Sequence, residues 1–147
     1  MVLQVVVDES GNWGVSDQDQ VLVIAGFIST ADKWQSFADA WVGAAIPKNA
    51  KMARVIQMAS KRQPNKIEQV LGMVEAQTES RVECAVHLES YRALIKGNVD
   101  AEIDSPYFFA FNEFCRRVAA TVVNVHRYAG TIDLFFDEGA LGRRAEK

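Results

Sequence analysis

A near-continuous run of β-branched residues at the start of the chain is the feature that most limits its fold. Residues 2–7 read VLQVVV, which is typical of a strand buried on both faces of a sheet. The run ends at DESG (8–11), and a second apolar run, VLVIAGFI, follows at 21–28. Two strands in succession predict a hairpin with a long loop.

Three later segments have the apolar spacing of helices. The first follows a cap at Ser29 or Thr30, the second begins after Pro64 and extends to about Gln77, and the third covers about 106–128, with Ser105-Pro106 at its start. We expect the apolar face of the first helix to lie against the sheet. That face contains Trp34, Phe37, Ala38, Trp41, Val42 and Ala45. The second helix has Ile67, Val70, Leu71 and Val74 as its apolar stripe, and the third has Phe108, Phe111, Cys115, Val118, Ala119 and Val122.

Further strands are expected at 81–88 and 131–136, with a weaker candidate at 52–58. In RVECAVHL (81–88), alternation places Val82, Cys84, Val86 and Leu88 on one face. The predicted order is β-β-α-(β)-α-β-α-β, which indicates an α/β fold with a mixed sheet whose later strands run parallel to the first. The last strand would lie near the middle of that sheet.

The chain has the size and composition of one globular domain. It has 147 residues, of which 49% are hydrophobic and 24% charged, and its net charge is -3. We therefore expect a single α/β domain over residues 1–147. Because no helix follows the last strand to cover the sheet, we also expect it to be a C-terminally truncated part of a longer protein.

Other features of the sequence indicate a soluble, cytoplasmic protein. No apolar run approaches the roughly 20 residues that span a bilayer, and the first ten residues lack the features of a signal peptide. Cys84 and Cys115 lie 31 positions apart within apolar segments. This spacing suits neither a disulfide framework nor a metal site, so we expect buried free thiols in a reducing compartment.

Acidic residues follow the first and the last predicted strands. VVVDESG places Asp8 after one strand, and LFFDEG places Asp137 after the other. If the strands are parallel neighbours, or one strand apart, both carboxylates emerge at one edge of the sheet, where sites in open α/β sheets collect. Close carboxylates need a cation, and Mg²⁺ or Mn²⁺ suits their oxygens. Such a site can cleave a phosphodiester.

Glu9 and Glu138 are second-tier members of this site, because strand alternation turns each away from the aspartate before it. An alternative explanation is that Asp and Gly end strands simply because they suit turns.

A segment free of acidic residues carries six positive charges between Trp41 and Ile67. It is a candidate contact for nucleic-acid phosphates, and the alternative is a solvated loop. Its basic residues are Lys48, Lys51, Arg54, Lys61, Arg62 and Lys66.

Three more residues are candidates for the acidic site. His87 lies in the 81–88 strand and Glu89 just beyond it, where a third ligand could stand; a strand histidine is more often part of the core. Trp13 follows Asp8 in the loop, where an aromatic ring could stack on a base.

An ordered set of motifs in the chain resembles the domain of unknown function 3800 family of bacteria and phages. Members begin with a strand ending in Asp-Glu-Ser-Gly, then a strand with a Gly-aromatic pair, here Gly26-Phe27, and a helix with a tryptophan, here Trp34. AVHLESYRAL and LFFDEG resemble later family segments, and VIQMAS stands where many members have Phe-His-Met-x-Asp. Gln57 and Ser60 thus occupy the histidine and acid positions.

The resemblance implies a ribonuclease H-like fold, metal-dependent nuclease activity and an acidic site that includes Asp8 and Asp137. Family members continue into a Gln-x-x-Asp helix, and this sequence ends before it. The leading hypothesis is therefore a Mg²⁺- or Mn²⁺-dependent nuclease. The alternative is a non-catalytic module that binds nucleic acid or protein, with a homo-oligomer as one form. A third possible function is that of a small-molecule hydrolase.

Overall fold

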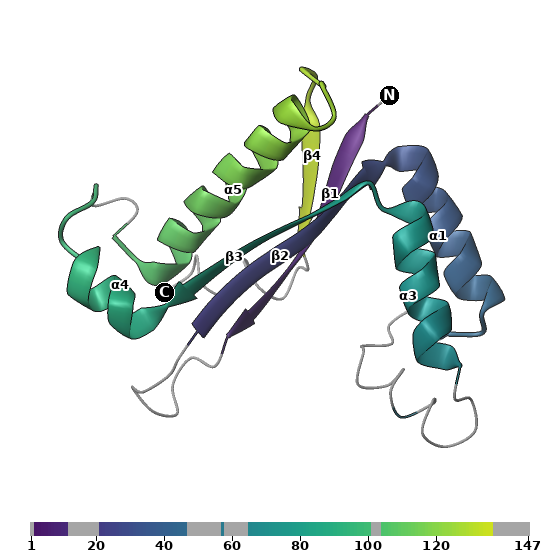
Figure 1. Ribbon diagram of the computed structural model, residues 1–147, viewed down its shortest axis with the longest axis horizontal. Helices are drawn as coiled ribbons and strands as arrows, with labels where there is room; N and C mark the ends of the chain where they lie inside the picture. The colour runs from purple at the N-terminus through teal and green to yellow at the C-terminus, as the bar shows by residue number, and fades with distance from the viewer. Residues whose placement is uncertain (1, 12–20, 47–56, 58–64, 101–103, 137–147) are drawn as a thin grey trace.

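The computed structural model describes residues 2–11, 21–46, 57, 65–100 and 104–136, which form an α/β fold (Figure 1). The strands and helices occur in the order β-β-α-α-β-α-α-β. Their bounds are β1 Leu3–Gly11, β2 Val21–Thr30, α1 Ala31–Gly43, α3 Lys66–Gln77, β3 Ser80–His87, α4 Leu88–Leu94, α5 Pro106–Asn124 and β4 Ile132–Phe136. The short helix α4 was not expected from the sequence, and the 52–58 strand candidate lies outside the described residues apart from Gln57, which is helical.

The sheet of the described chain is mixed and open, with strand order β3-β2-β1-β4. β1 and β2 form the expected hairpin, paired antiparallel from Leu3 opposite Thr30 onward. β3 also runs antiparallel to β2, and β4 runs parallel to β1. The expected mixed sheet is therefore confirmed. The expected central place of the last strand is wrong, because β4 lies at the edge of this sheet.

The main core lies between the sheet and α5, which packs on β2 and β3. Alternation in β3 puts Val82, Cys84 and Val86 on the buried face, as expected. Ser105 caps α5 by accepting a hydrogen bond from the Phe108 amide at 3.2 Å. The buried stripe of α5 differs in part from the expected one. It consists of Tyr107, Ala110, Phe114, Val118 and Val122, while Phe108 and Ala119 face solvent.

α1 starts as expected but does not pack its apolar face on the sheet. Thr30 caps it, accepting a hydrogen bond from the Lys33 amide at 3.3 Å. No residue of α1 is buried, and Trp41 packs on the small cluster around Val70 of α3. The expectation is therefore wrong, because an amphipathic helix can bury its stripe against another helix instead of a sheet.

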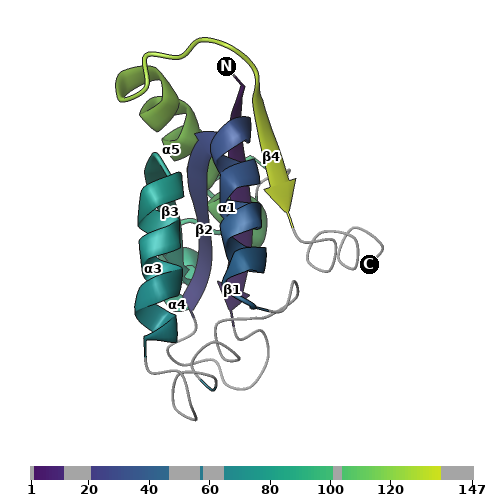
Figure 2. The same ribbon diagram turned by 90° about the vertical axis from the view of Figure 1, so that its right-hand side faces the viewer.

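The α1–α3 pair lies on the side of the sheet opposite α5 (Figure 2). It meets the sheet at one corner, where the Trp34 indole donates to the Gln4 carbonyl at 3.3 Å and Ser29 Oγ donates to the Gln77 carbonyl at 2.5 Å. An ion pair of 2.7 Å between Lys33 and Glu79 adds to this corner. Much of the sheet face on this side therefore stays open, and we call it the open face.

Both cysteines are free, as expected. Cys84 is buried, whereas Cys115 is only half-buried. Burial raises the pKa of both thiols, so neither is activated as a nucleophile.

Candidate functional site

Asp8 lies on β1 with its side chain on the open face. Val5 and Val7 point into the core beneath α5, so the alternation of the strand turns Val6 and Asp8 the other way. Asp8 is exposed, and its Oδ1 accepts a hydrogen bond from the Glu9 amide at 2.8 Å. A hydrated carboxylate in this position is available to a cation or to a substrate.

Asp8 was expected to follow the first strand but lies within β1, which continues to Gly11, and β4 ends beside Val7. Val7 and Phe136 are Cα partners in the parallel β1–β4 pair, and Asp8 follows Val7 directly. The condition that the sequence reasoning required, parallel neighbouring strands, is therefore met. Asp137 and Glu138 themselves lie outside the described residues.

Glu9 points away from Asp8, toward the side of the sheet that α5 covers. The residue is half-buried, and its Oε2 is buried without a hydrogen-bond partner in the described part of the chain. A carboxylate oxygen buried in this way costs free energy. Glu9 thus stands beside the acidic edge but on the opposite face from Asp8, as alternation predicted.

Glu83 is an acidic residue on the open face that the sequence reasoning missed. The register places Asp8 opposite Ala25 on β2 and Ala25 opposite Glu83 on β3, so all three share one row. At a strand spacing of about 4.8 Å, the Cα atoms of Asp8 and Glu83 lie roughly 10 Å apart. Alternation in RVECAVHL already turns Glu83 to this face, but only the register aligns it with Asp8.

His87 lies far from Asp8 and has a structural role. It pairs with Val21, four rows beyond Asp8 and two strands away, or about 13 Å further along the strands. Its Nδ1 caps α4, at 3.4 Å from the Ser90 amide and 3.2 Å from Ser90 Oγ. Glu89 is exposed in the first turn of the same helix. The structure therefore brings neither residue to the acidic edge.

Of the six basic residues in the segment, only Lys66 is described, and it links α1 and α3. Lys66 Nζ donates to the Ala44 carbonyl at 2.8 Å and to Gln69 Oε1 at 2.9 Å. The first bond places a cation at the C-terminal end of α1, which is favourable for the helix dipole. The other predicted contacts lie outside the described residues. They are Trp13, Lys48, Lys51, Arg54, Lys61 and Arg62.

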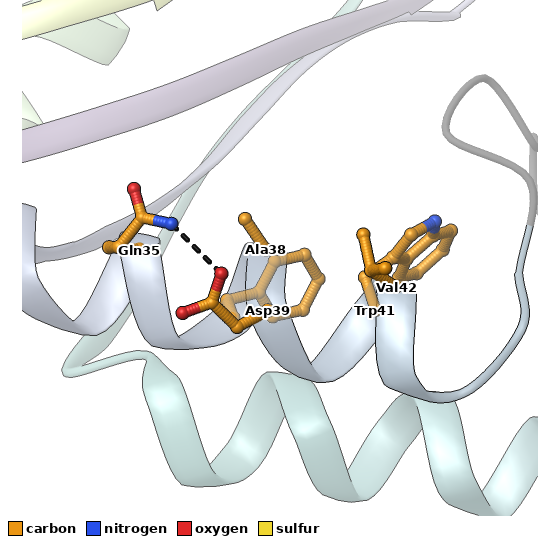
Figure 3. Close-up of a pocket in the computed structure, with 6 residues that line it drawn as sticks. Gln35, Ala38, Asp39, Trp41 and Val42 are labelled. Carbon is orange, nitrogen blue, oxygen red and sulfur yellow. Dashed lines mark hydrogen bonds between the residues drawn. The ribbon is translucent and has the colours of Figure 1, made fainter.

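A hollow of about 630 Å³ lies along α1 (Figure 3). Figure 3 shows Gln35 and Ala38 directed toward the strands of the sheet. Gln35 Nε2 donates to Asp39 Oδ1 at 3.0 Å on the wall of the hollow. The described lining comes entirely from α1: Gln35, Phe37, Ala38, Asp39, Trp41 and Val42.

Within the described residues, no group of three or more His, Cys, Asp or Glu side chains could hold a metal ion. Asp8 supplies one accessible hard oxygen ligand, and the further acids of the edge, Asp137 and Glu138, follow the neighbouring strand in the sequence. The described part of the chain thus contributes one carboxylate, Asp8, to the expected metal site.

Comparison of the chain with protein-family models, curated proteins and solved structures finds no match. Among the described residues, no helix is both long and apolar enough to cross a bilayer.

Proposed function

We propose that this chain is a metal-dependent nuclease with a ribonuclease H-like fold. The observation that carries the proposal is the pairing of Val7 with Phe136, which makes β1, the strand that contains Asp8, a parallel neighbour of β4, the strand that precedes Asp137 in the sequence. In this proposal Asp8 and Asp137 are metal ligands, and Glu9 and Glu138 assist. The mixed sheet with helices on both sides is consistent with the proposed fold.

The chemistry assigns separate tasks to the carboxylates. A bound Mg²⁺ or Mn²⁺ would polarise the phosphodiester and lower the pKa of an attacking water. Asp8, exposed on the open face, would hold the ion where a phosphate can approach from solvent. Glu9 faces the other side of β1, so it would act on Asp8 through the backbone rather than touch the substrate; its amide donates to Asp8 Oδ1 and restrains that carboxylate.

Calorimetric titration with Mn²⁺ tests the metal site. We expect the wild-type chain to bind Mn²⁺ and the Asp8→Asn variant to lose most of that affinity. Asp133→Asn is the matched control, because Asp133 is also an exposed aspartate, on β4. Equal binding by the wild type and by Asp8→Asn would refute the assignment.

Nuclease assays then test the activity with single-stranded and duplex DNA and RNA. Cleavage should require Mg²⁺ or Mn²⁺ and disappear in Asp8→Asn. Mutation of a residue that only supports a metal ligand typically lowers metal affinity or activity about 10- to 100-fold. Removal of a ligand itself should lower activity by at least that factor. Metal-independent cleavage would exclude the mechanism.

The second candidate function is a non-catalytic module that binds nucleic acid or protein. The observation that favours it is the exposure of Val6 and Phe135 on the open face, since exposed apolar patches commonly mark binding surfaces. Binding that persists in Asp8→Asn, with no cleavage by the wild type, would select this function. Both candidates are consistent with a cytoplasmic protein whose two cysteines are free.

A further inference from the structure

Carboxylates flank an apolar row on the open face. The row consists of Val6 on β1 and its Cα partners, Phe27 on β2 and Phe135 on β4. Val6 is 44% exposed and Phe135 is 49% exposed, while Phe27 is half-buried. The exposed carboxylates on the same face belong to Asp8, Glu83 and Asp133. This face is therefore both apolar and acidic.

The negative charges of the open face are only partly balanced. Among the described strand residues of this face, Arg81 on β3 is the one arginine or lysine, and it lies 3.6 Å from the Glu83 carboxylate. Asp8 and Asp133 have no ion-pair partner in the described part of the chain. The face thus has an excess of negative charge, which a cationic partner would neutralise.

The two carboxylates without an ion pair lie on opposite sides of the apolar row. Asp133 is the Cα partner of Gln4, which precedes Val6 by two residues on this face, and Asp8 follows Val6 by two residues. The Cα atoms of Asp133 and Asp8 are therefore about 14 Å apart. A ligand that covers this face needs apolar groups at its centre and a positive charge toward each end.

The hollow along α1 adds surface of the same kind on this side of the sheet (Figure 2, Figure 3). In its wall Val42 is 59% exposed, and Ala38 is directed toward the strands. Asp39 contributes a further exposed carboxylate to the same wall. The volume of about 630 Å³ is in the range of ligand sites. Both the strands and α1 therefore suit an apolar and positively charged occupant.

We propose that the open face binds a basic amphipathic segment of a partner protein, with apolar side chains on the apolar row and Lys or Arg side chains at Asp8 and Asp133. Burial of the row removes exposed apolar area from water, and each cation of the segment meets a carboxylate. Without a bound metal ion, the same charges disfavour a nucleic acid, an anionic lipid surface or a second copy of this face. Each of these would bring negative charge toward the carboxylates.

This inference goes beyond the proposed function and meets it at Asp8. A Lys or Arg side chain and a Mn²⁺ ion would compete for the same carboxylate, so each should weaken the binding of the other. Asp133 belongs to the partner surface alone. Failure of the metal site would leave the wild type without Mn²⁺ affinity but with unchanged peptide binding in EDTA, so the two failures are distinguishable.

Fluorescence anisotropy in EDTA with a labelled amphipathic Leu/Lys peptide tests the surface, and a Leu/Glu peptide of the same pattern is the charge-reversed probe. We expect the wild type to bind the Leu/Lys peptide, more weakly as NaCl is added, and not the Leu/Glu peptide. Phe135→Ala should weaken binding about fivefold or more, as for an interface residue that contributes strongly. Asp133→Lys should weaken binding of the Leu/Lys peptide about two- to fivefold and strengthen binding of the Leu/Glu peptide. Loss of folding cannot produce this reversal.

Glu89→Lys is the matched control for charge, because it changes the net charge as Asp133→Lys does. Glu89 is exposed on α4, whose buried residues Leu88 and Tyr91 belong to the core on the α5 side of the sheet. At physiological salt this variant should bind both peptides as the wild type does.

Three results would overturn the inference. They are no binding of the Leu/Lys peptide by the wild type, equal effects of Asp133→Lys and Glu89→Lys, and a dimer in sedimentation velocity that Phe135→Ala dissociates. The last would identify the apolar row as an interface between copies of the chain.

Discussion

Gly26 lies where β2 is pressed between β1 and α5, and a methyl group there has no room. A Cβ built on Gly26 would lie 2.9 Å from the Val6 carbonyl oxygen, 3.1 Å from Phe114 Cζ and 3.2 Å from Val5 Cγ1. The first contact is with the backbone of a paired strand, and Phe114 is fully buried. Neither can move without disturbing the core. Overpacking of this kind costs about 1–3 kcal/mol, so Gly26→Ala should lower the free energy of unfolding by that amount.

Gly72 provides the matched control for the same chemical change. It lies within α3, and a Cβ there would meet nothing within 4 Å. Alanine favours a helix over glycine by about 1 kcal/mol, so Gly72→Ala should raise the free energy of unfolding. Urea unfolding followed by circular dichroism measures both, with an unchanged slope as the check that only stability has altered. A Gly26→Ala midpoint equal to or above that of the wild type would refute the packing argument.

Two further predictions concern ionisable groups. The hydrogen bond from Lys33 holds the pKa of Glu79 below its usual 4.5. The stability that this pair contributes is therefore present above pH 4.5 and is lost as pH falls through the lowered pKa. Lys33→Met should flatten that part of the stability–pH curve, and an unchanged curve would contradict the pairing. Burial, together with a hydrogen bond to Asp104 at 2.9 Å, raises the pKa of Tyr91 to about 12, so its contribution is complete below pH 10 and is lost as pH rises toward 12. Tyr91→Phe should lower the free energy of unfolding at pH 7 by about 1.5–3 kcal/mol. Urea unfolding at several pH values should show this difference from wild type shrinking above about pH 10. A difference that does not depend on pH would show that the phenol does not titrate as described.

Local features of the fold were predictable from the sequence because they depend on neighbouring residues. Thr30 and Ser105 cap α1 and α5 with their own side chains, and the β1–β2 hairpin follows from two adjacent apolar runs. α5 shows where local reasoning fails. Its apolar residues form two stripes one position apart, one through Phe108 and one through Tyr107, and both match the helical period. Contact with the sheet selects the stripe that includes Phe114.

The packing of α1 was not predictable for a related reason. Its periodicity indicates that one face is apolar but does not specify what covers that face. Both the sheet and α3 offer apolar partners, and Trp41 packs with the cluster that includes Val70 on α3. Val6 and Phe135 on the open face stay exposed.

The register between β1 and β4 determines which side chains of the two strands share a face and which residue of β1 lies beside the end of β4. Sequence alone does not specify this register, because a shift of one residue keeps both strands apolar while it turns every side chain of β4 to the other face. In the observed register, Phe136 points to the α5 side and lies 5.6 Å, between ring centroids, from Phe111. A shift by one would bring Phe136 to the open face and lose this contact. The packing of Phe111 on Phe136 therefore favours the register that places Phe135 beside Val6 and ends β4 next to Val7.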